Sequence, residues 1–392
     1  MLKTIRDYLG IGCIGFLELM IALFPITAGY AYSPIYLSFV IPFLIIVYCL
    51  YKGVVPYKNK PLKYFAIFLT VHEIALTIFC SYVGFTPITN LVGDITHIIV
   101  ILYAIKIMSY EKLKGSIYLV AVVSSIGILY HFILIRNGQV VTPIQIPFLP
   151  DPGPDSRLHE VGIRPVSFFW EPAAYASYMI VPLFISLTEK RYTMAAFCLF
   201  FIFVSTSTLG IVLSTILLVT WTILSNNGRF SKAVIIVLGA VLIYLVTQTN
   251  IFEAGLNKIA DTNLEETART INGPVLAENM SLADYLFGLP DNTPTDYWKK
   301  GNIIDSRFIA EEELYLSTFW YVLAKLGIIG FALYMSIIIS TVMRNKQVLP
   351  IIIVLFVSMF SSNMYIGPQF VFYFTYLYLL KLKTENNYGP ET

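Results

Sequence analysis

The sequence predicts an all-α polytopic integral membrane protein with about twelve transmembrane helices and two long extracytoplasmic loops. Three observations predict this class: few charges, a succession of apolar runs, and basic residues in alternate connections. Hydrophobic residues make up 57% of the 392 positions and charged residues 13%, whereas soluble domains carry about 25% charged residues. The mean hydropathy is +0.73. We expect a single membrane domain over residues 1–392.

Net charge and cysteine spacing exclude other classes. The formal net charge of +2 offers no broad basic surface, so no nucleic-acid partner is expected. The four cysteines lie within apolar runs and lack a CxxC spacing, which predicts buried apolar side chains rather than disulfides or a zinc site. No acidic cluster is dense enough to require a divalent metal, so we expect no metal and no cofactor.

Twelve apolar runs approach the roughly 20 residues that a spanning helix needs. The first run follows Lys3 and Arg6 as a signal peptide would, but it is long and carries Glu18, which favours a retained helix. The predicted spans are centred on 8–28, 32–51, 63–82, 91–108, 116–135, 167–187, 192–207, 209–225, 233–249, 314–340, 348–363 and 369–383.

The distribution of lysine and arginine predicts the sidedness of these spans. With the N-terminus placed in the cytoplasm, 17 of the 26 basic residues fall in the two tails and the inside connections. The four short outside turns, near 29–31, 83–90, 207–209 and 364–368, hold none. This asymmetry is the positive-inside rule for short loops. It predicts both termini in the cytoplasm.

Two outside segments are long, about 136–166 and 250–313. Long loops within a compact protein are often functional. Most of the remaining basic residues lie there: Arg136, Arg157, Arg164, Lys258, Arg269, Lys299, Lys300 and Arg307. Because the planar guanidinium fork suits phosphate, the candidate ligands are lipid diphosphates or anionic lipid headgroups.

The strongest local signal is the string 164–172, RPVSFFWEP, at the predicted outer edge of a span. Arg164 lies a few residues before the helix, and Glu171 about one turn inside it. Charges this close to an apolar span are costly, which favours a polar ligand. The alternative is that Arg164 and Glu171 pair only with each other. For Arg136 and Arg157, a solvated loop charge is the simpler interpretation.

The same string resembles the Arg-x-x-Ser-Phe-Phe-x-Glu-Pro segment of O-antigen and capsular polysaccharide polymerases of the Wzy type. Three further pieces are similar to that family: the turn at 205–210 (STSTLG), Arg269 followed by 286–288 (LFG), and 312–316 (EELYL) followed by 327–330 (GIIG). The resemblance covers about 160–335, and the N-terminal third matches only in hydropathy. The related O-antigen ligases have a His-Asn pair at the loop exit where this chain has glutamates, which favours a polymerase.

The resemblance implies a GT-C-like membrane glycosyltransferase whose active site lies on the extracytoplasmic face. Its substrate would be an oligosaccharide repeat unit on undecaprenyl diphosphate, transferred without a metal. Its expected partners are the lipid bilayer, a flippase and a chain-length co-polymerase. Electrostatic stabilisation would fall to Arg164 and Arg269. The candidate proton acceptors are Glu171, Glu312 and Glu313, and the candidate substrate-binding residues are Arg157, His159, Arg307, Asp94, His97 and Tyr315.

Ionisable residues inside spans are functional candidates and normally have a partner. Asp94 and His97 lie one turn apart and could line the same cavity as Glu171. Lys325, about 16 Å beyond Leu314 by helical rise, is expected to form a structural ion pair with Glu18 or Glu73. Tyrosines at span ends suit interfacial anchoring; they are Tyr30, Tyr32, Tyr110, Tyr178 and Tyr365.

Two other functions compete with the polymerase. One is an O-antigen ligase or another lipid-to-acceptor glycan transferase. The other is a flippase or transporter, which should place paired broken helices and ion sites near mid-membrane. This chain instead concentrates its polar residues outside, in two unequal loops.

Overall fold

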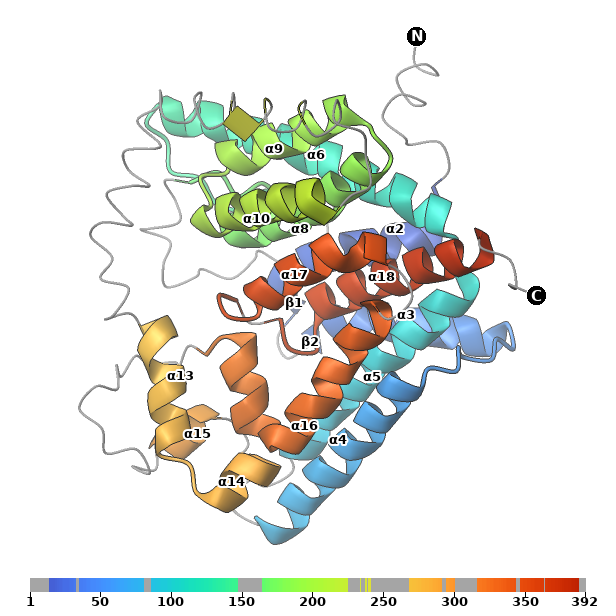
Figure 1. Ribbon diagram of the computed structural model, residues 1–392, viewed down its shortest axis with the longest axis vertical. Helices are drawn as coiled ribbons and strands as arrows, with labels where there is room; N and C mark the ends of the chain where they lie inside the picture. The colour runs from blue at the N-terminus through green and yellow to red at the C-terminus, as the bar shows by residue number, and fades with distance from the viewer. Residues whose placement is uncertain are drawn as a thin grey trace.

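The computed structural model describes most of the chain as a bundle of α-helices (Figure 1). Besides a few isolated positions between 233 and 240, the described residues are 14–32, 35–80, 86–146, 164–224, 268–290, 294–299, 316–342, 346–362 and 364–387. The longer helices are α2 (Phe16–Leu23), α3 (Leu37–Tyr51), α4 (Lys60–Phe79), α5 (Thr86–Ile107), α6 (Tyr110–Arg136), α8 (Pro172–Thr188), α9 (Tyr192–Val204), α10 (Thr208–Leu224), α13 (Ala268–Glu278), α16 (Thr318–Val342), α17 (Leu349–Ser358) and α18 (Pro368–Asn387).

The remaining elements are short. They are η1 (Phe24–Gly29), α14 (Leu282–Phe287), α15 (Pro294–Lys299), η4 (Lys346–Val348), and the strands β1 (Ala31–Tyr32) and β2 (Ile35–Tyr36). The two strands form an antiparallel pair in which Ala31 faces Tyr36 and Tyr32 faces Ile35. The predicted all-α class is therefore confirmed for the described residues, with this two-residue hairpin as an addition.

Within the described residues, four helices, α4, α5, α6 and α16, are long and apolar enough to cross a membrane by length and composition. Shorter apolar helices lie at six more of the predicted spans, between Phe16 and Ser358. The run 233–249 falls almost entirely outside the described residues. A membrane protein is the class that these helices support, whereas the count of twelve spans, the sidedness and the type of membrane stay predictions.

The helices are arranged in two groups joined by a central layer (Figure 1). In one group α8 packs against α6, α9 and α10. In the other, α4 packs against α5 and α16, and the short helices α13, α14 and α15 contact α16. Helices α17 and α18 lie between the groups, because α17 contacts α10 and α18 contacts α5 and η1.

Local sequence explains where several helices begin. Asn59 caps α4 by accepting a hydrogen bond from the Leu62 amide at 3.0 Å, and Pro61 occupies the first turn, where a missing N–H has no cost. Pro172 starts α8 in the same way, after Glu171 in an extended conformation. The start of α8 therefore fixes the end of the string 164–172.

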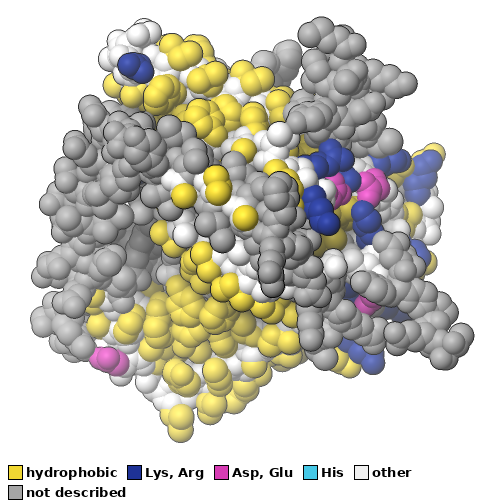
Figure 2. Space-filling view, turned by 45° about the horizontal axis from the view of Figure 1, so that its top comes forward, with side chains coloured by type: hydrophobic (Ala, Val, Ile, Leu, Met, Phe, Trp, Pro, Cys, Tyr) yellow, Lys and Arg dark blue, Asp and Glu magenta, His cyan; other side chains and the backbone are white. Residues whose placement is uncertain are grey.

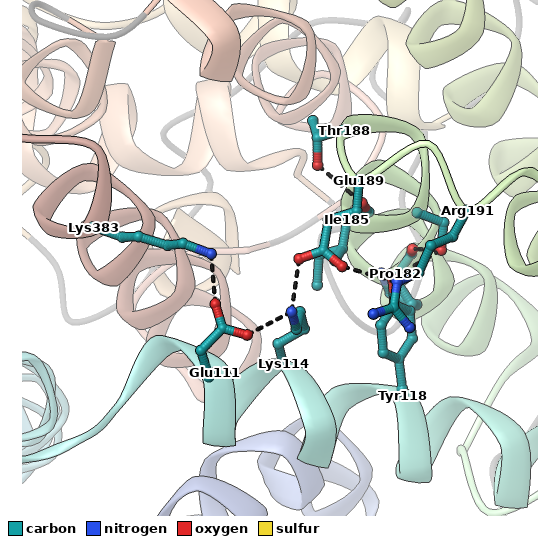
Figure 3. A network of polar contacts seen from close by, with 10 residues as sticks. Glu111, Lys114, Tyr118, Pro182, Ile185, Thr188, Glu189, Arg191 and Lys383 are labelled. Carbon is teal, nitrogen blue, oxygen red and sulfur yellow. Dashed lines mark hydrogen bonds and ion pairs between the residues drawn. The ribbon is translucent and has the colours of Figure 1, made fainter. Parts of the chain in front are cut away.

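Charged residues from two connections and the C-terminal tail, all predicted to be cytoplasmic, meet in one network (Figure 3). Lys114 Nζ lies 2.6 Å from Glu111 Oε2 and 2.7 Å from Glu189 Oε1. Glu189 also pairs with Arg191 at 3.1 Å, and Lys383 pairs with Glu111. Figure 2 shows basic and acidic side chains gathered at one edge, beside a broad hydrophobic surface. The arrangement agrees with the prediction that these connections share a side.

Candidate functional site

The string 164–172 forms a buried turn held by a histidine from α6. The amides of Val166 and Ser167 both donate to Nδ1 of His131, at 3.3 and 3.2 Å. Since that nitrogen accepts two hydrogen bonds, the neutral His131 ring carries its proton on Nε2. Ser167 has a φ of 58°, a left-handed conformation that is costly for a side chain other than glycine. The turn is therefore strained and over-determined by its surroundings.

Tyr30 ties the same turn to the N-terminal part of the chain. Its hydroxyl lies 3.1 Å from the Ile144 carbonyl oxygen and 3.4 Å from that of Phe168. The Ile144 amide in turn donates to the Ser167 carbonyl at 2.7 Å. Burial raises the pKa of Tyr30 to about 12, so its hydroxyl stays protonated and remains a donor. Tyr30 is a buried structural residue, and its predicted role as an interfacial anchor is wrong.

The two charged ends of the string lie partly exposed on either side of this buried centre. Phe169 is fully buried and packs against the rings of Tyr175 and Tyr178, at centroid distances of 5.6 and 5.5 Å. Arg164 and Glu171 are each half-buried. Among the described residues, no ion pair joins Arg164 to Glu171. The alternative in which they only neutralise each other gains no support.

A second polar site lies between α4, α5 and α16, and all of its charges are buried. Lys325 Nζ lies 3.5 Å from Glu73 Oε1, and the two side chains are 3% and 1% exposed. The expected structural pair with Glu73 is therefore confirmed. Glu18, the other predicted partner, accepts a hydrogen bond from the Ser109 amide at 3.0 Å.

Asp94 and Tyr365 complete this buried cluster. The Tyr365 hydroxyl donates to Asp94 Oδ2 at 2.9 Å, and its ring lies under Lys325 Nζ at 5.3 Å and beside Tyr321 at 5.1 Å. Tyr365 thus contacts two of the interior charges, and because its side chain is half-buried, its predicted role as an interfacial anchor stays a prediction. The sequence did not indicate the contact of Tyr365 with Asp94, because an aromatic residue at a span end is typical of the membrane interface.

Helical rise places the three charges at a common depth. Glu73 lies six residues before the end of α4, Asp94 eight residues after the start of α5, and Lys325 seven residues after the start of α16. These separations correspond to about 9–12 Å from helix ends that are all predicted to be on the outer side. Lys325 is therefore nearer the surface than the predicted 16 Å, because α16 begins at Thr318.

His97 lies one turn after Asp94 in α5 and packs against the segment that leads to Tyr30. It is 4% exposed, its Nδ1 lies 2.8 Å from the Gly93 carbonyl oxygen, and its ring contacts Phe24 at 5.8 Å. Phe24 begins η1, and Tyr30 follows directly after η1. Asp94 and His97 are held inside the bundle, and their predicted contact with substrate requires these helices to separate.

Two other motif pieces, 286–288 and 327–330, meet in space. Helix α16 is interrupted at Gly327, which has a φ of 65°. A Cβ on Gly327 would collide with the backbone of Leu286 and Gly288, and one on Gly288 would collide with the Lys325 carbonyl. The Leu289 amide donates to the Ala324 carbonyl at 2.8 Å. The glycines are required because two backbones touch at this point.

The turn at 205–210 packs against α8. Thr206 has a φ of 57°, the Gly210 amide donates to Ser207 Oγ at 3.2 Å, and a Cβ on Gly210 would collide with Ala176. This motif piece therefore lies beside the first turns of the helix that follows the string 164–172. The string and this turn belong to one packed unit, which sequence order alone did not indicate.

Several predicted site residues lie outside the described residues: Arg157, His159, Arg307, Glu312, Glu313 and Tyr315. Arg269 lies in the first turn of α13, but its side chain is outside the description. Within the described part of the chain, no group of three or more His, Cys, Asp or Glu side chains could hold a metal ion. The roles proposed for these residues stay predictions.

Comparison with known proteins adds no assignment. No family model, no curated protein and no solved structure matches this chain.

Proposed function

We propose that this protein is a membrane glycosyltransferase that polymerises oligosaccharide repeat units carried on undecaprenyl diphosphate. The reaction would take place at the outer face of the bacterial cytoplasmic membrane, in O-antigen or capsule biosynthesis. The observation that carries the proposal is the placement of Arg164. A half-buried guanidinium stands at the start of the rigid turn that leads into α8, without an ion-pair partner among the described residues.

This placement suits a diphosphate because the surrounding turn is fixed. The two amides bound to His131 and the carbonyl of Ser167 bound to Ile144 hold the backbone three residues from Arg164. A positioned charge costs little reorganisation when a leaving group develops negative charge. The sequence resemblance of the string to polysaccharide polymerases supports the same ligand class.

In the proposed reaction, a hydroxyl oxygen of the newly arrived unit bonds to the anomeric carbon of the growing chain. The bond between that carbon and the carrier's phosphate oxygen breaks, and undecaprenyl diphosphate leaves. Arg164 and Arg269 would stabilise the departing diphosphate, and the hydroxyl proton would pass to a carboxylate. Glu171, half-buried at the start of α8, is the candidate base within the described residues.

Deletion with complementation, read on a polysaccharide gel, tests the proposal. Loss of the gene should leave single repeat units on the lipid acceptor. Arg164→Ala should fail to restore the ladder, with at least a hundredfold loss of polymer, about 2.7 kcal/mol. Arg164→Lys should restore only part of it, because lysine lacks the paired donors.

Arg136→Ala is the matched control, since Arg136 is an exposed arginine at the end of α6. It should give a full ladder at equal protein level in the membrane. A full ladder with Arg164→Ala would contradict the diphosphate role. Accumulation of complete polymer on its lipid carrier in the deletion strain would instead indicate a ligase.

A further inference from the structure

Helix α14 carries an apolar surface that no other part of the structure covers. None of its six residues is buried. Leu282 is 77% exposed and Phe287 is 58% exposed, and Tyr285 and Leu286 are exposed too. Its polar residue Asp284 is occupied in a capping box with Ser281 at the start of the helix. In water, a six-residue helix with four large exposed apolar side chains would be an unfavourable element.

The C-terminal end of α14 contacts α4 at a residue that lies before the C-terminal end of α4. His72 Nε2 lies 2.9 Å from the Phe287 carbonyl oxygen. His72 is seven residues before the last residue of α4, Phe79, which corresponds to about 10 Å along the helix axis. On the other side, the Gly288 backbone touches α16 at its break, and that break lies nine residues after the start of α16. The contacts with α4 and with α16 therefore both place Phe287 alongside these helices, at a level before the C-terminal end of α4 and after the start of α16.

We propose that α14 is a re-entrant helix, which brings the second long loop into the membrane so that lipid acyl chains cover Leu282 and Phe287. The leaflet is the one that holds the C-terminal end of α4. The segment 250–313 is then divided by a membrane-embedded element at 282–287. This proposal concerns the position of α14 and does not depend on the proposed reaction.

The backbone of this segment meets the requirement that a lipid environment imposes. Polar backbone groups at membrane depth need partners within the protein. The Gly288 amide donates to Asp284, the Leu289 amide donates to Ala324, and the Phe287 carbonyl contacts His72. At the start of α14, the amides of Ser281 and Asp284 are hydrogen-bonded within the capping box that these two residues form.

Continuity with α4 identifies lipid as the partner. The exposed side of α4 near its C-terminal end is apolar: Val71 is 64% exposed, Ile78 66% and Phe79 83%. This helix is one of the four candidate spans, so its exposed side chains face acyl chains. Because His72 joins α14 to this stretch of α4, the two helices lie beside each other (Figure 1), and their exposed apolar side chains face the same surroundings.

Site-directed spin labelling of the full-length protein in liposomes tests the proposal. Native cysteines are replaced, and single nitroxides are attached at Leu282→Cys and Phe287→Cys. The ratio of collision rates with oxygen and with a water-soluble nickel chelate reports immersion in acyl chains. Both labels should give a ratio at least threefold higher than Glu278→Cys, an exposed position in α13, and close to Ile74→Cys on α4.

Two results would overturn the proposal. A ratio equal to that of Glu278→Cys would place α14 in water. Poor access to both reagents would show that a protein surface, such as a second copy of this chain, covers it. If a cysteine variant does not insert, Leu282→Trp provides a second measurement. Its added fluorescence should be quenched by lipids brominated on the acyl chain, and the absence of quenching would contradict immersion.

Discussion

The turn at 164–172 and the cluster of Glu73, Asp94 and Lys325 differ in how far their charged side chains are exposed. The turn buries its backbone and aromatic residues and leaves Arg164 and Glu171 partly exposed at its ends. The cluster buries all three charges, at 8% exposure or less, and orders them with Tyr365. A half-exposed, positioned charge can meet a ligand, whereas a buried charge first has to be compensated by its neighbours. Three of the four substitutions below test that contrast through stability, and Gly327→Ala tests the contact between α14 and α16.

Lys325→Met should have the largest effect on stability. Removing one partner of a buried pair leaves Glu73 uncompensated, which costs about 3–5 kcal/mol. Thermal unfolding in detergent measures the loss. The double variant Glu73→Gln with Lys325→Met should recover more than half of it, because no unpaired charge remains from the pair. If the double variant is as unstable as Lys325→Met alone, the pair does not carry the effect.

Gly327→Ala should have the next largest effect. It combines a backbone conformation that is essentially restricted to glycine (φ 65°, ψ -176°), about 1–3 kcal/mol, with a collision against the backbone of Leu286 and Gly288. Gly53→Ala is the control, because Gly53 also has a positive φ, of 66°, but nothing within 4 Å of the added Cβ. The larger loss expected at Gly327 reports its backbone conformation together with the contact of α14 with α16. Equal losses would show that this contact contributes nothing.

Tyr365→Phe removes the hydrogen bond to the buried Asp94 carboxylate and keeps the ring. Hydrogen bonds to charged groups contribute about 1.5–3 kcal/mol, so thermal unfolding should show a loss of that size. Tyr378→Phe serves as the control, since its hydroxyl contacts the uncharged Ser340 hydroxyl at 3.0 Å. Its loss should be smaller, about 0.5–1.5 kcal/mol. A reversed order would contradict the importance of Asp94.

Arg164→Ala should have the smallest effect on stability, within about 0.5 kcal/mol, because its side chain is half-exposed and outside any ion pair among the described residues. The same unfolding measurement checks this. A loss as large as that of Lys325→Met would show that Arg164 is a structural residue. The contrast between the two regions would then no longer hold.

The sequence predicted helices better than it predicted their neighbours. Hydropathy locates a span such as α4 because about 20 apolar residues are needed to cross a bilayer. It does not say which helices touch, so Glu18 and Glu73 were equal partners for Lys325 until the packing of α4 against α16 distinguished them. Long-range adjacency depends on the fit between side chains of distant segments.

The candidate site was predictable where a local motif carries it. Arg164 lies before the helix as expected, but Glu171, predicted about one turn inside it, precedes the first helical residue, because Pro172 starts α8. The histidine that holds the turn was not predictable, because His131 lies 36 residues before Ser167 and nothing in the α6 sequence marks it as a backbone acceptor. The break at Gly327 was missed for a similar reason, since a glycine within an apolar run is also typical of close helix packing.

The contact between Gly288 and Gly327 also has a consequence for how this protein can vary. Although 39 positions separate them, the two residues touch, so the two ends of the stretch between them are held together. For a flexible loop with fixed ends, doubling the length costs only about 0.6 kcal/mol. A change of chain length between α15 and α16 should therefore leave the contact between α14 and α16 in place.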